Sequence, residues 1–463
     1  MKTKNLLASC LFFLMGSMLT STMSAQNNGL YPGFPDRSIN QDILPGFKNP
    51  PKGYGEVSFY WWVGDTLTKD RIISQLDQLK DHNITGLQIN YCHTDKGGAT
   101  YGLTYPSQPA LFSPEWWELF RWFLQEAKKR DMSVSLSDYT LGAAGQGWFV
   151  DEMLKENRNY GSKLEAKLLE LKAPQHFKER VPEEVITAFA YPVINGNVSN
   201  AGSIDLKSKI KNSELEWQVP SGDWKIILVY RITVKTSFDP MNPVSGAKVV
   251  EKFYQRFEDH CPGESGKGLN YFFSDELQFG IRGFLWNDRF AGEFRKRKGY
   301  DILPELPHLF AFIGPRSVKI RLDYNDVMVA LSEEGFFKPV YDWHNSRGML
   351  FGCDHGGRGR DVTEFGDYFR TQRWMSGPGC DQPGLGRDIV KNKVASSIAH
   401  LYERPRTWLE GFYGSGWGTS SEEIADATFA NFAMGHNLLS LHGLYYTTHG
   451  SWWEWAAPDN HWR

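Results

Sequence analysis

Short apolar runs that end in a carboxylate are the feature that most limits what this chain can fold into. In residues 270–280, NYFFSDELQFG, an aromatic run changes abruptly to acid at Asp275 and Glu276, and residues 406–414, RTWLEGFYG, repeat the design with Glu410. Ionised carboxylates are rarely buried unless they are paired or used. We therefore predict that both runs are strands opening into a site, and that Glu276 and Glu410 form a catalytic pair.

Eight strand candidates alternate with helical patterns along the chain. They lie at residues 57–62, 86–91, 133–137, 271–273, 348–353, 373–377, 407–409 and 437–442. The helical patterns between them have clear start signals, such as Ser113-Pro114 and the pair Ser420 and Glu423. Strands that alternate with amphipathic helices predict a parallel sheet with both faces covered. Eight of them predict an α/β fold of the (β/α)8 TIM-barrel type, which can bring Glu276 and Glu410 face to face.

The alternation breaks between residues 162 and 235, where short β-like runs are separated by turns such as Asn195-Gly196. We predict a small β-rich insertion there, after the third strand. It would divide the barrel into a first part at 56–161 and a remainder at 236–463. Residues 26–55, rich in Pro, Gly and Asn, are predicted to form an extended leader. Because no eighth helix follows the eighth strand, we expect a barrel that is truncated at that point.

The first 25 residues have the pattern of a secretory signal peptide. Lys2 and Lys4 precede an apolar run from Leu6 to Leu19, and Ser24-Ala25 offers a small-residue cleavage site. The apolar run is too short to span a bilayer, and no later stretch is long and apolar enough for a membrane helix. We therefore expect a periplasmic or secreted protein after removal of residues 1–25.

Charge and composition narrow the classes of partner. The formal net charge is −3, and loss of the predicted signal peptide, with two lysines and no acids, leaves −5. Without a basic run, this argues against a nucleic-acid partner. Aromatic residues make up 14% of the chain, and their flat rings suit the apolar faces of sugars as well as a large core. The four later cysteines fit buried thiols, although a Cys353–Cys380 disulfide stays open.

In such barrels the reactive groups gather at the C-terminal ends of the strands. On this strand assignment, those positions hold nine ionisable residues: Asp65, His93, Asp138, Asp275, Glu276, Asp354, His355, Glu410 and His442. We predict that the two glutamates are catalytic and that the other seven, together with Trp62 and Trp417, bind substrate. Ion pairing would also account for each glutamate, and Asp65 and Asp138 could equally cap the helices that follow them.

Two carboxylates on opposite sides of one pocket are what glycosidic hydrolysis requires. One is kept protonated to donate to the leaving oxygen, and the other is ionised to activate water or attack carbon. A carboxyl separation near ~5 Å would favour retention of configuration, and one of ~6.5–9.5 Å would favour inversion. No HExxH or EF-hand pattern is present and the histidines are not spaced as a zinc set, so the sequence assigns no metal ligand.

Together these residues resemble glycoside hydrolase family 106, the α-L-rhamnosidases. The resemblance lies in residues 47–51 (FKNPP), 59–65 (FYWWVGD), 273–276 (FSDE), 410–412 (EGF) and 442–446 (HGLYY). It implies an exo-acting, inverting hydrolase that removes terminal L-rhamnose from plant polysaccharide, with Glu276 as general acid and Glu410 as general base. It also implies calcium contacting the sugar, and C-terminal β-sandwich modules that this chain lacks.

Two alternatives stay open at the level of sequence. One is a retaining (β/α)8 glycosidase of other specificity, with its acid on the fourth strand and its nucleophile on the seventh. That clan usually shows Asn-Glu on the fourth strand, where this chain has Asp275-Glu276. The other alternative is a truncated, inactive remnant that binds carbohydrate.

Overall fold

The computed structural model describes residues 48, 56–62, 65–90, 108–110, 112–137, 154, 160–172, 174–355, 363–416 and 418–447. At a few of these positions, Asp275, Cys353 and His355 among them, it describes the backbone alone. The chain divides into residues 1–30 and residues 31–463, and every element below belongs to the second unit. The predicted signal peptide and nearly all of the predicted leader lie outside the described residues.

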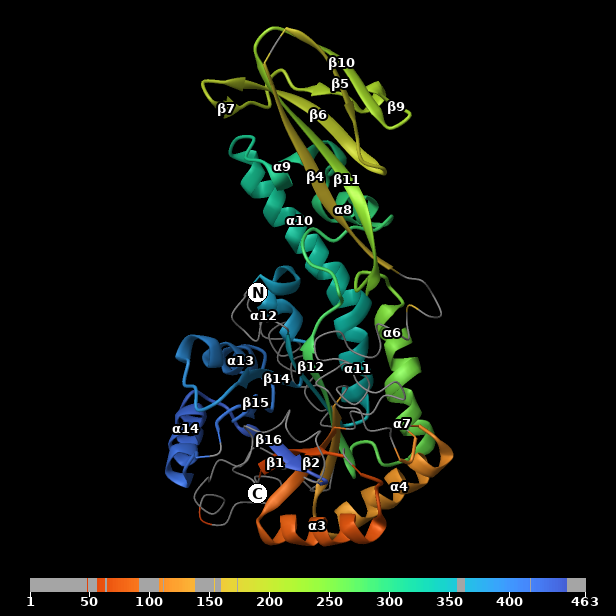
Figure 1. Cartoon of the computed structure of the whole chain (residues 1–463), viewed down its shortest axis with the longest axis vertical. Helices are drawn as coiled ribbons and strands as arrows, with labels where there is room; N and C mark the ends of the chain where they lie inside the picture. The colour runs from red at the N-terminus through yellow and green to blue at the C-terminus, as the bar shows by residue number, and fades with distance from the viewer. Residues whose placement is uncertain are drawn as a thin grey trace, which may run out of the picture. The chain divides into compact units, whose positions relative to one another are not determined.

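Eight parallel strands close into a barrel, which confirms the predicted (β/α)8 fold class (Figure 1). In chain order they are β1 (Glu56–Trp61), β2 (Ile84–Asn90), β3 (Ser133–Ser137), β12 (Leu269–Leu277), β13 (Leu350–His355), β14 (Gly377–Gln382), β15 (Trp408–Gly411) and β16 (Leu438–Tyr445). Around the barrel the order is β1-β16-β15-β14-β13-β12-β3-β2. The pairing of β1 with β16, where Val57 lies opposite Ser440, closes it.

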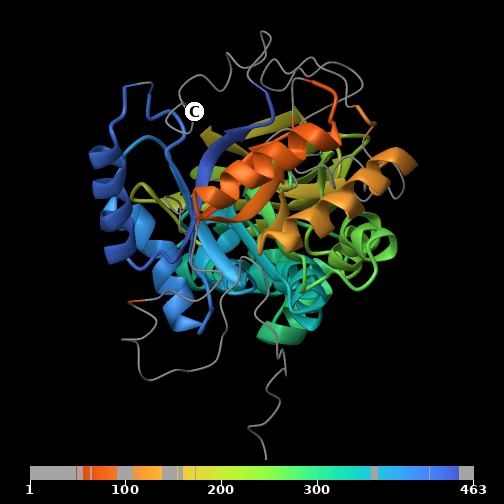
Figure 2. The same ribbon diagram turned by 90° about the horizontal axis from the view of Figure 1, so that it is seen from below.

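Helices fill the connections between the strands. They are α3 (Lys69–Asp81), α4 (Pro114–Lys129), α6 (Ser245–Val249), α7 (Gln255–His260), α8 (Phe290–Lys298), α9 (Pro307–Phe310), α10 (Arg316–Ser332), α11 (Lys338–Ser346), α12 (Tyr368–Gln372), α13 (Ile389–Leu401) and α14 (Ser421–Ala433). Helices α3 and α4, drawn in orange, pack beside each other (Figure 2).

The helix starts predicted from the sequence are present. Ser113 Oγ accepts the main-chain N–H of Trp116 at 3.1 Å, ahead of Pro114 in the first helical position. Ser420 and Glu423 form a reciprocal capping box at the start of α14. These caps fix where each helix leaves the barrel loop that precedes it.

Large side chains facing glycines fill the barrel interior. A buried cluster of Val57, Phe59, Trp61, Tyr271, Phe273, Leu350, Trp408 and Leu438 takes alternate residues from the strands. Tyr271 lies over Gly352, where an added Cβ would come within 2.2 Å of its hydroxyl, and Trp408 lies over Gly379, where the gap would be 2.3 Å. The barrel interior below the C-terminal ends of the strands is thus filled by large, mostly apolar side chains. Polar side chains gather at the C-terminal ends of the strands.

The sixth strand differs from the prediction. Residues 373–377 were expected to form it, but Arg373 directly follows α12 and β14 runs from Gly377 to Gln382. The sequence of β14, GPGCDQ, holds two glycines and a proline, so it lacks the apolar, β-branched pattern that marks a strand. All six residues are buried. The sixth strand thus begins at residue 377, where the predicted strand ended, and Asp381 lies near its C-terminal end.

The predicted β-rich insertion is present between β3 and β12. Strands β4 (Tyr160–Lys172) and β11 (Asp223–Phe238) pair antiparallel, and β6 (Val185–Ile194), β7 (Asn197–Val198) and β8 (Ile204–Asp205) join the same sheet. Strands β5 (Gln175–Arg180), β10 (Glu214–Val219) and β9 (Ile210–Lys211) form a second sheet. Asn195 and Gly196 have φ of 52° and 76°, as a tight hairpin turn between β6 and β7 requires.

Two of the cysteines are buried free thiols, Cys261 and Cys380. A disulfide between Cys353 and Cys380 is therefore not formed, which agrees with the interpretation of the cysteines as core thiols. Within the described ranges, no helix has the length and apolar character needed to cross a membrane.

A buried histidine makes stability depend on pH. His344 of α11 is fully buried, its Nδ1 lies 2.8 Å from the Val340 carbonyl oxygen, and its ring stacks on Phe351. Burial lowers the pKa of His344 from 6.5 to about 3. The unfolded chain therefore takes up this proton first, so the stability that depends on neutral His344 is lost as pH falls from about 6.5 towards 3.

We expect the difference in unfolding free energy between wild type and His344→Phe to change by up to about 1.4 kcal/mol per pH unit between pH 6 and pH 4. Phenylalanine keeps the contact with Phe351 and takes up no proton, so the variant should lose less stability on acidification. Urea unfolding followed by tryptophan fluorescence at several pH values measures this difference. A difference that stays constant with pH would contradict the prediction.

Candidate active site

Among the side chains that the structure describes, five neighbouring strands each bring one ionisable group to the C-terminal end of the barrel. Strands β12, β13, β14, β15 and β16 are consecutive around the barrel. In that order they hold Glu276, Asp354, Asp381, Glu410 and His442. The last four are buried, whereas Glu276 is partly exposed at the rim. The chain thus builds an arc of four carboxylates and one imidazole along one wall of the barrel.

Glu276 sits on an irregularity of its strand. Its φ is +45°, a left-handed value that non-glycine residues seldom adopt, and the register between β12 and β13 shifts between Ser274 and Leu277. The main-chain N–H of Glu276 donates to Asp354 Oδ1 at 2.9 Å, which holds this conformation. Such bulges commonly re-aim a side chain next to an active site. Here the irregularity turns Glu276 out of the regular alternation of β12.

Glu410 lies three strands away from Glu276 around the eight-stranded barrel, and so on the facing side of its mouth. In the sheet register it lies opposite Asp381 on one side and Ser440 on the other. His442 Nε2 is 4.0 Å from Glu410 Oε1, beyond hydrogen-bond distance but close enough for a charge on one to affect the other.

The His442 ring is fixed by aromatic packing. Its centroid lies 5.1 Å from that of Phe59, 5.3 Å from that of Trp61 and 4.9 Å from that of Tyr413. Two of these contacts, to Phe59 and Tyr413, are edge-on, which is a favoured aromatic geometry. The imidazole is therefore held at a set distance from Glu410, with Trp61 forming part of the same wall.

The charges of three of the carboxylates act on one buried thiol. Burial is the main cause that raises the pKa of Cys380; Lys391 opposes it, and the charges of Asp354, Asp381 and Glu410 add to it. Lys391 of α13 is itself buried and donates to the main-chain carbonyl oxygen of Asp381. A positive charge therefore lies behind the wall that carries the negative ones, where it offsets part of their mutual repulsion.

The remaining residues predicted to bind substrate lie in different places. Trp62 is fully buried on the outer side of β1, edge-on to Phe123 of α4 at 4.8 Å, so it is a core residue and the prediction that it binds substrate is wrong. Asp65 accepts from Arg71 Nη1 at 2.8 Å, so it forms an ion pair beside the start of α3, and the cap position of that helix is held by Thr68. His93, Asp138 and Trp417, and the side chains of Asp275 and His355, lie outside what the structure describes.

Sequence reasoning missed Asp381, Trp61 and Lys391. Asp381 was overlooked because its strand was assigned a few residues too early. Trp61 was passed over for its neighbour Trp62, although only the alternation of β1 decides which ring faces the barrel interior. Lys391 belongs to a helix and gave no signal, since a single lysine in a helical pattern is normally exposed.

The described residues do not by themselves make a metal site. No group of three or more His, Cys, Asp or Glu side chains among them is placed to hold a metal ion. No calcium ligand is assigned, and the calcium that the family resemblance implies stays a prediction.

Comparison with known proteins gives three findings. A family model described as alpha-L-rhamnosidase matches residues 169–447. A curated protein of Formosa agariphila, described as a putative beta-glucuronidase, is 21% identical across 95% of this chain and 42% of its own length. A rhamnosidase structure from Novosphingobium sp. PP1Y has a TM-score of 0.65 at 15% identity, covering 88% of this chain and 57% of that one. The chain thus spans less than two thirds of either relative, and the structural likeness shows the fold alone.

Proposed function

This chain belongs to glycoside hydrolase family 106, the α-L-rhamnosidases, and we propose that it removes terminal α-L-rhamnose, or a related sugar, from plant-derived oligosaccharide or polysaccharide. The observation that carries the proposal is the arc of carboxylates, in which Glu276 and Glu410 end strands three positions apart in one barrel. Two carboxyl groups facing each other across a pocket are the minimum machinery for glycosidic hydrolysis.

In the proposed mechanism Glu276 is the general acid. Its protonated carboxyl gives a proton to the glycosidic oxygen as the bond between that oxygen and the anomeric carbon breaks. Asp354 supports this role because its carboxylate accepts the main-chain N–H of Glu276 and so fixes the backbone that carries the acid. The partly exposed position of Glu276 at the rim suits a residue that must meet an outgoing leaving group.

Glu410 is the general base in this proposal. Its carboxylate takes a proton from water as the water oxygen bonds to the anomeric carbon, on the face opposite the leaving group. Glu410 is buried, and His442 Nε2 lies 4.0 Å from its Oε1, so the carboxylate has an imidazole beside it. The configuration of the released sugar would then be inverted.

Inversion predicts that β-L-rhamnose is the first product formed from an α-L-rhamnoside. Proton NMR during the first minutes of hydrolysis distinguishes the two anomers, and α-L-rhamnose dissolved in the same buffer gives the rate of spontaneous mutarotation. If the α-anomer appears first, the alternative of a retaining glycosidase replaces this one. If no rhamnoside or other aryl glycoside is hydrolysed by the folded chain, the alternative of a sugar-binding remnant replaces both.

We also propose that the protein acts in the periplasm or outside the cell, on the basis of the signal pattern in residues 1–25. Calcium stays a prediction of the family resemblance alone, and no step of the mechanism passes through it. Hydrolysis measured with and without a chelator tests that prediction directly.

A further inference from the structure

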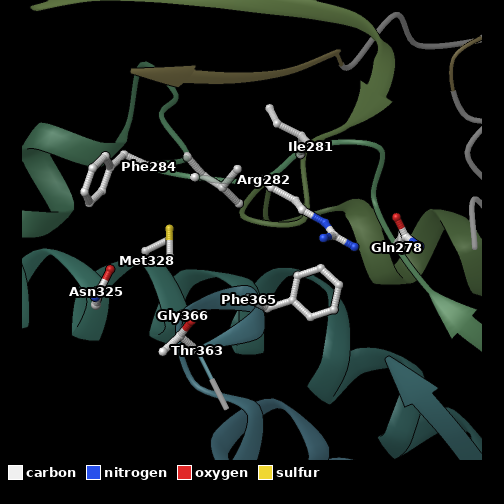
Figure 3. Close-up of a pocket in the computed structure, with 11 residues that line it drawn as sticks. Gln278, Ile281, Arg282, Phe284, Asn325, Met328, Thr363, Phe365 and Gly366 are labelled. Atoms are coloured by element: carbon white, nitrogen blue, oxygen red, sulfur yellow. The ribbon is translucent and has the colours of Figure 1, made fainter. Parts of the chain in front are cut away.

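A cavity that the proposed mechanism does not use lies along the segment that follows β12. It has a volume of about 250 Å³ (Figure 3). One wall is the segment from Gln278 to Leu285 that follows β12, and the other is formed by α10 and the turn that precedes α12. The described residues that line it are Gln278, Ile281, Arg282, Gly283, Phe284, Leu285, Asn325, Met328, Thr363, Phe365 and Gly366.

The cavity adjoins the proposed general acid. Gln278 follows Glu276 by two residues, so at most ~7 Å of extended chain separates the two Cα atoms. Phe279 follows Gln278 in the first wall, and its ring packs on Phe365 of the second wall with centroids 4.9 Å apart. This contact joins the two walls. The first wall directly follows β12, the strand that carries Glu276, and the turn in the second wall comes after β13, the strand that carries Asp354. A ligand in the cavity would thus lie on the acid side of the site.

Arg282 gives the cavity its chemical character. The side chain is exposed and extends from the upper wall towards Phe365 (Figure 3). Among the residues that the structure describes, it makes no hydrogen bond or ion pair, unlike Arg231 and Arg297, which are both paired to carboxylates. None of the lining residues that the structure describes is acidic. A guanidinium stays charged at every working pH, so this cavity holds a permanent positive charge without a partner in the described structure.

The other lining groups suit a sugar ring. The aromatic rings of Phe284 and Phe365 offer flat apolar surfaces, and the side chains of Gln278 and Asn325 offer amide donors and acceptors for hydroxyl groups. The planar fork of Arg282 matches a carboxylate or sulfate group, because both present two oxygens to parallel N–H donors. One apolar wall, two amides and one guanidinium are a set of groups complementary to an anionic sugar.

We propose that this cavity binds the sugar unit to which the terminal rhamnose is attached, and that this unit carries an oxyanion held by Arg282. The oxyanion is a uronate carboxylate or a sulfate ester. The inference rests on the proposed function, since it takes Glu276 as the acid that protonates the bond between the two sugars. The leaving group is then recognised by charge as well as by shape.

The test compares matched rhamnosides that differ in the leaving sugar. Rhamnosyl-galacturonate, the same disaccharide reduced to galactose, and its 6-sulfate are the three substrates. For the wild type, kcat/KM is expected to be higher for at least one anionic substrate than for the neutral one. In Arg282→Gln the ratio of anionic to neutral kcat/KM is expected to fall 10- to 100-fold, the range for loss of a hydrogen-bonded charge.

Arg289→Gln is the matched control. Arg289 is also exposed, lies seven residues further along and is not among the residues lining the cavity, and its ion pair is with Glu293 of α8. This variant should keep the wild-type ratio. A preference for the uronate over the sulfate identifies the carboxylate as the natural oxyanion, and the reverse identifies the sulfate ester.

Binding measurements keep the two proposals apart. Titration calorimetry of galacturonate disaccharide and of galactose 6-sulfate needs no hydrolysis and compares wild type with Arg282→Gln. If no rhamnoside is hydrolysed but one of these ligands binds and loses at least tenfold in affinity in the variant, the proposed function fails and the cavity assignment holds. Rhamnoside hydrolysis with equal kcat/KM for neutral and anionic substrates, or a ratio unchanged in Arg282→Gln, overturns the cavity assignment alone.

Discussion

Glu276→Gln is expected to lower kcat for a rhamnosyl disaccharide by about 10²- to 10⁴-fold, and to lower it much less for a nitrophenyl rhamnoside. A sugar hydroxyl is a poor leaving group and needs the proton, whereas a nitrophenolate leaves with little help. Glu410→Gln is expected to lower kcat by a similar factor for both substrates, because activation of water is required whichever group leaves. The contrast between the two variants assigns acid and base separately.

Glutamine keeps the size of the side chain, so both variants should unfold at close to the wild-type temperature. Glu422→Gln, on the exposed start of α14, is the control and should retain wild-type kcat on both substrates. More than a tenth of the wild-type kcat in Glu410→Gln would reject that residue as the base. The next residue to test would then be Asp381, which lies opposite Glu410 in the sheet register.

The barrel could be predicted from sequence because most of its strands are apolar runs closed by a polar residue. Strands β12 and β15 show this pattern most clearly, with three aromatic residues before Ser274 and with Trp408-Leu409 before Glu410. Strand β14 could not be found in this way. Its Gly379 leaves room for the ring of Trp408, and that requirement depends on a residue in another strand, which no local pattern records.

The sequence also did not show which side chains of a strand face the barrel interior, and this has a general cause. A parallel barrel strand is buried on both sides, by the interior on one and by helices on the other, so apolar residues occupy both faces. In β1, Phe59 and Trp61 face the interior and Tyr60 and Trp62 face outwards, yet the sequence shows an unbroken aromatic run. The choice of Trp62 over Trp61 as a sugar-binding residue therefore rested on position in the chain alone.

In helix α13, too, the sequence pattern did not show which face is buried. Val390, Val394, Ile398 and Leu401 form a stripe at helical spacing, but Val390 and Leu401 are 82% and 67% exposed. The buried face instead includes Lys391, Asn392 and Ser396, which bond to main-chain and side-chain groups of neighbouring elements. Ile398 of the stripe is fully buried and Val394 is half-buried, so the hydrophobic pattern marks only part of the buried face, and the helix behind the carboxylate wall buries polar groups as well.

The second large effect is expected at Gly379, beneath the site. An added Cβ would lie 2.3 Å from Trp408 Cε3, and Trp408 is fully buried with its ring centroid 4.0 Å from that of Phe273. The ring has no free space to move into, so Gly379→Ala is expected to lower the free energy of unfolding by about 3 kcal/mol. Because Trp408 precedes Glu410 by two residues on the same inner row, kcat should fall as well.

Two further variants make this prediction specific to the contact. Trp408→Phe shortens the opposing ring, so the double variant Gly379→Ala/Trp408→Phe should cost less than the sum of the single changes, with a coupling of about 0.5–3 kcal/mol. Gly292→Ala, in α8 with no atom near the added Cβ, should instead stabilise by about 0.5–1 kcal/mol through helix propensity. Additive costs in the double variant would show that the interior beneath Glu410 yields to an extra methyl group, and that the glycine of β14 is not what positions the base.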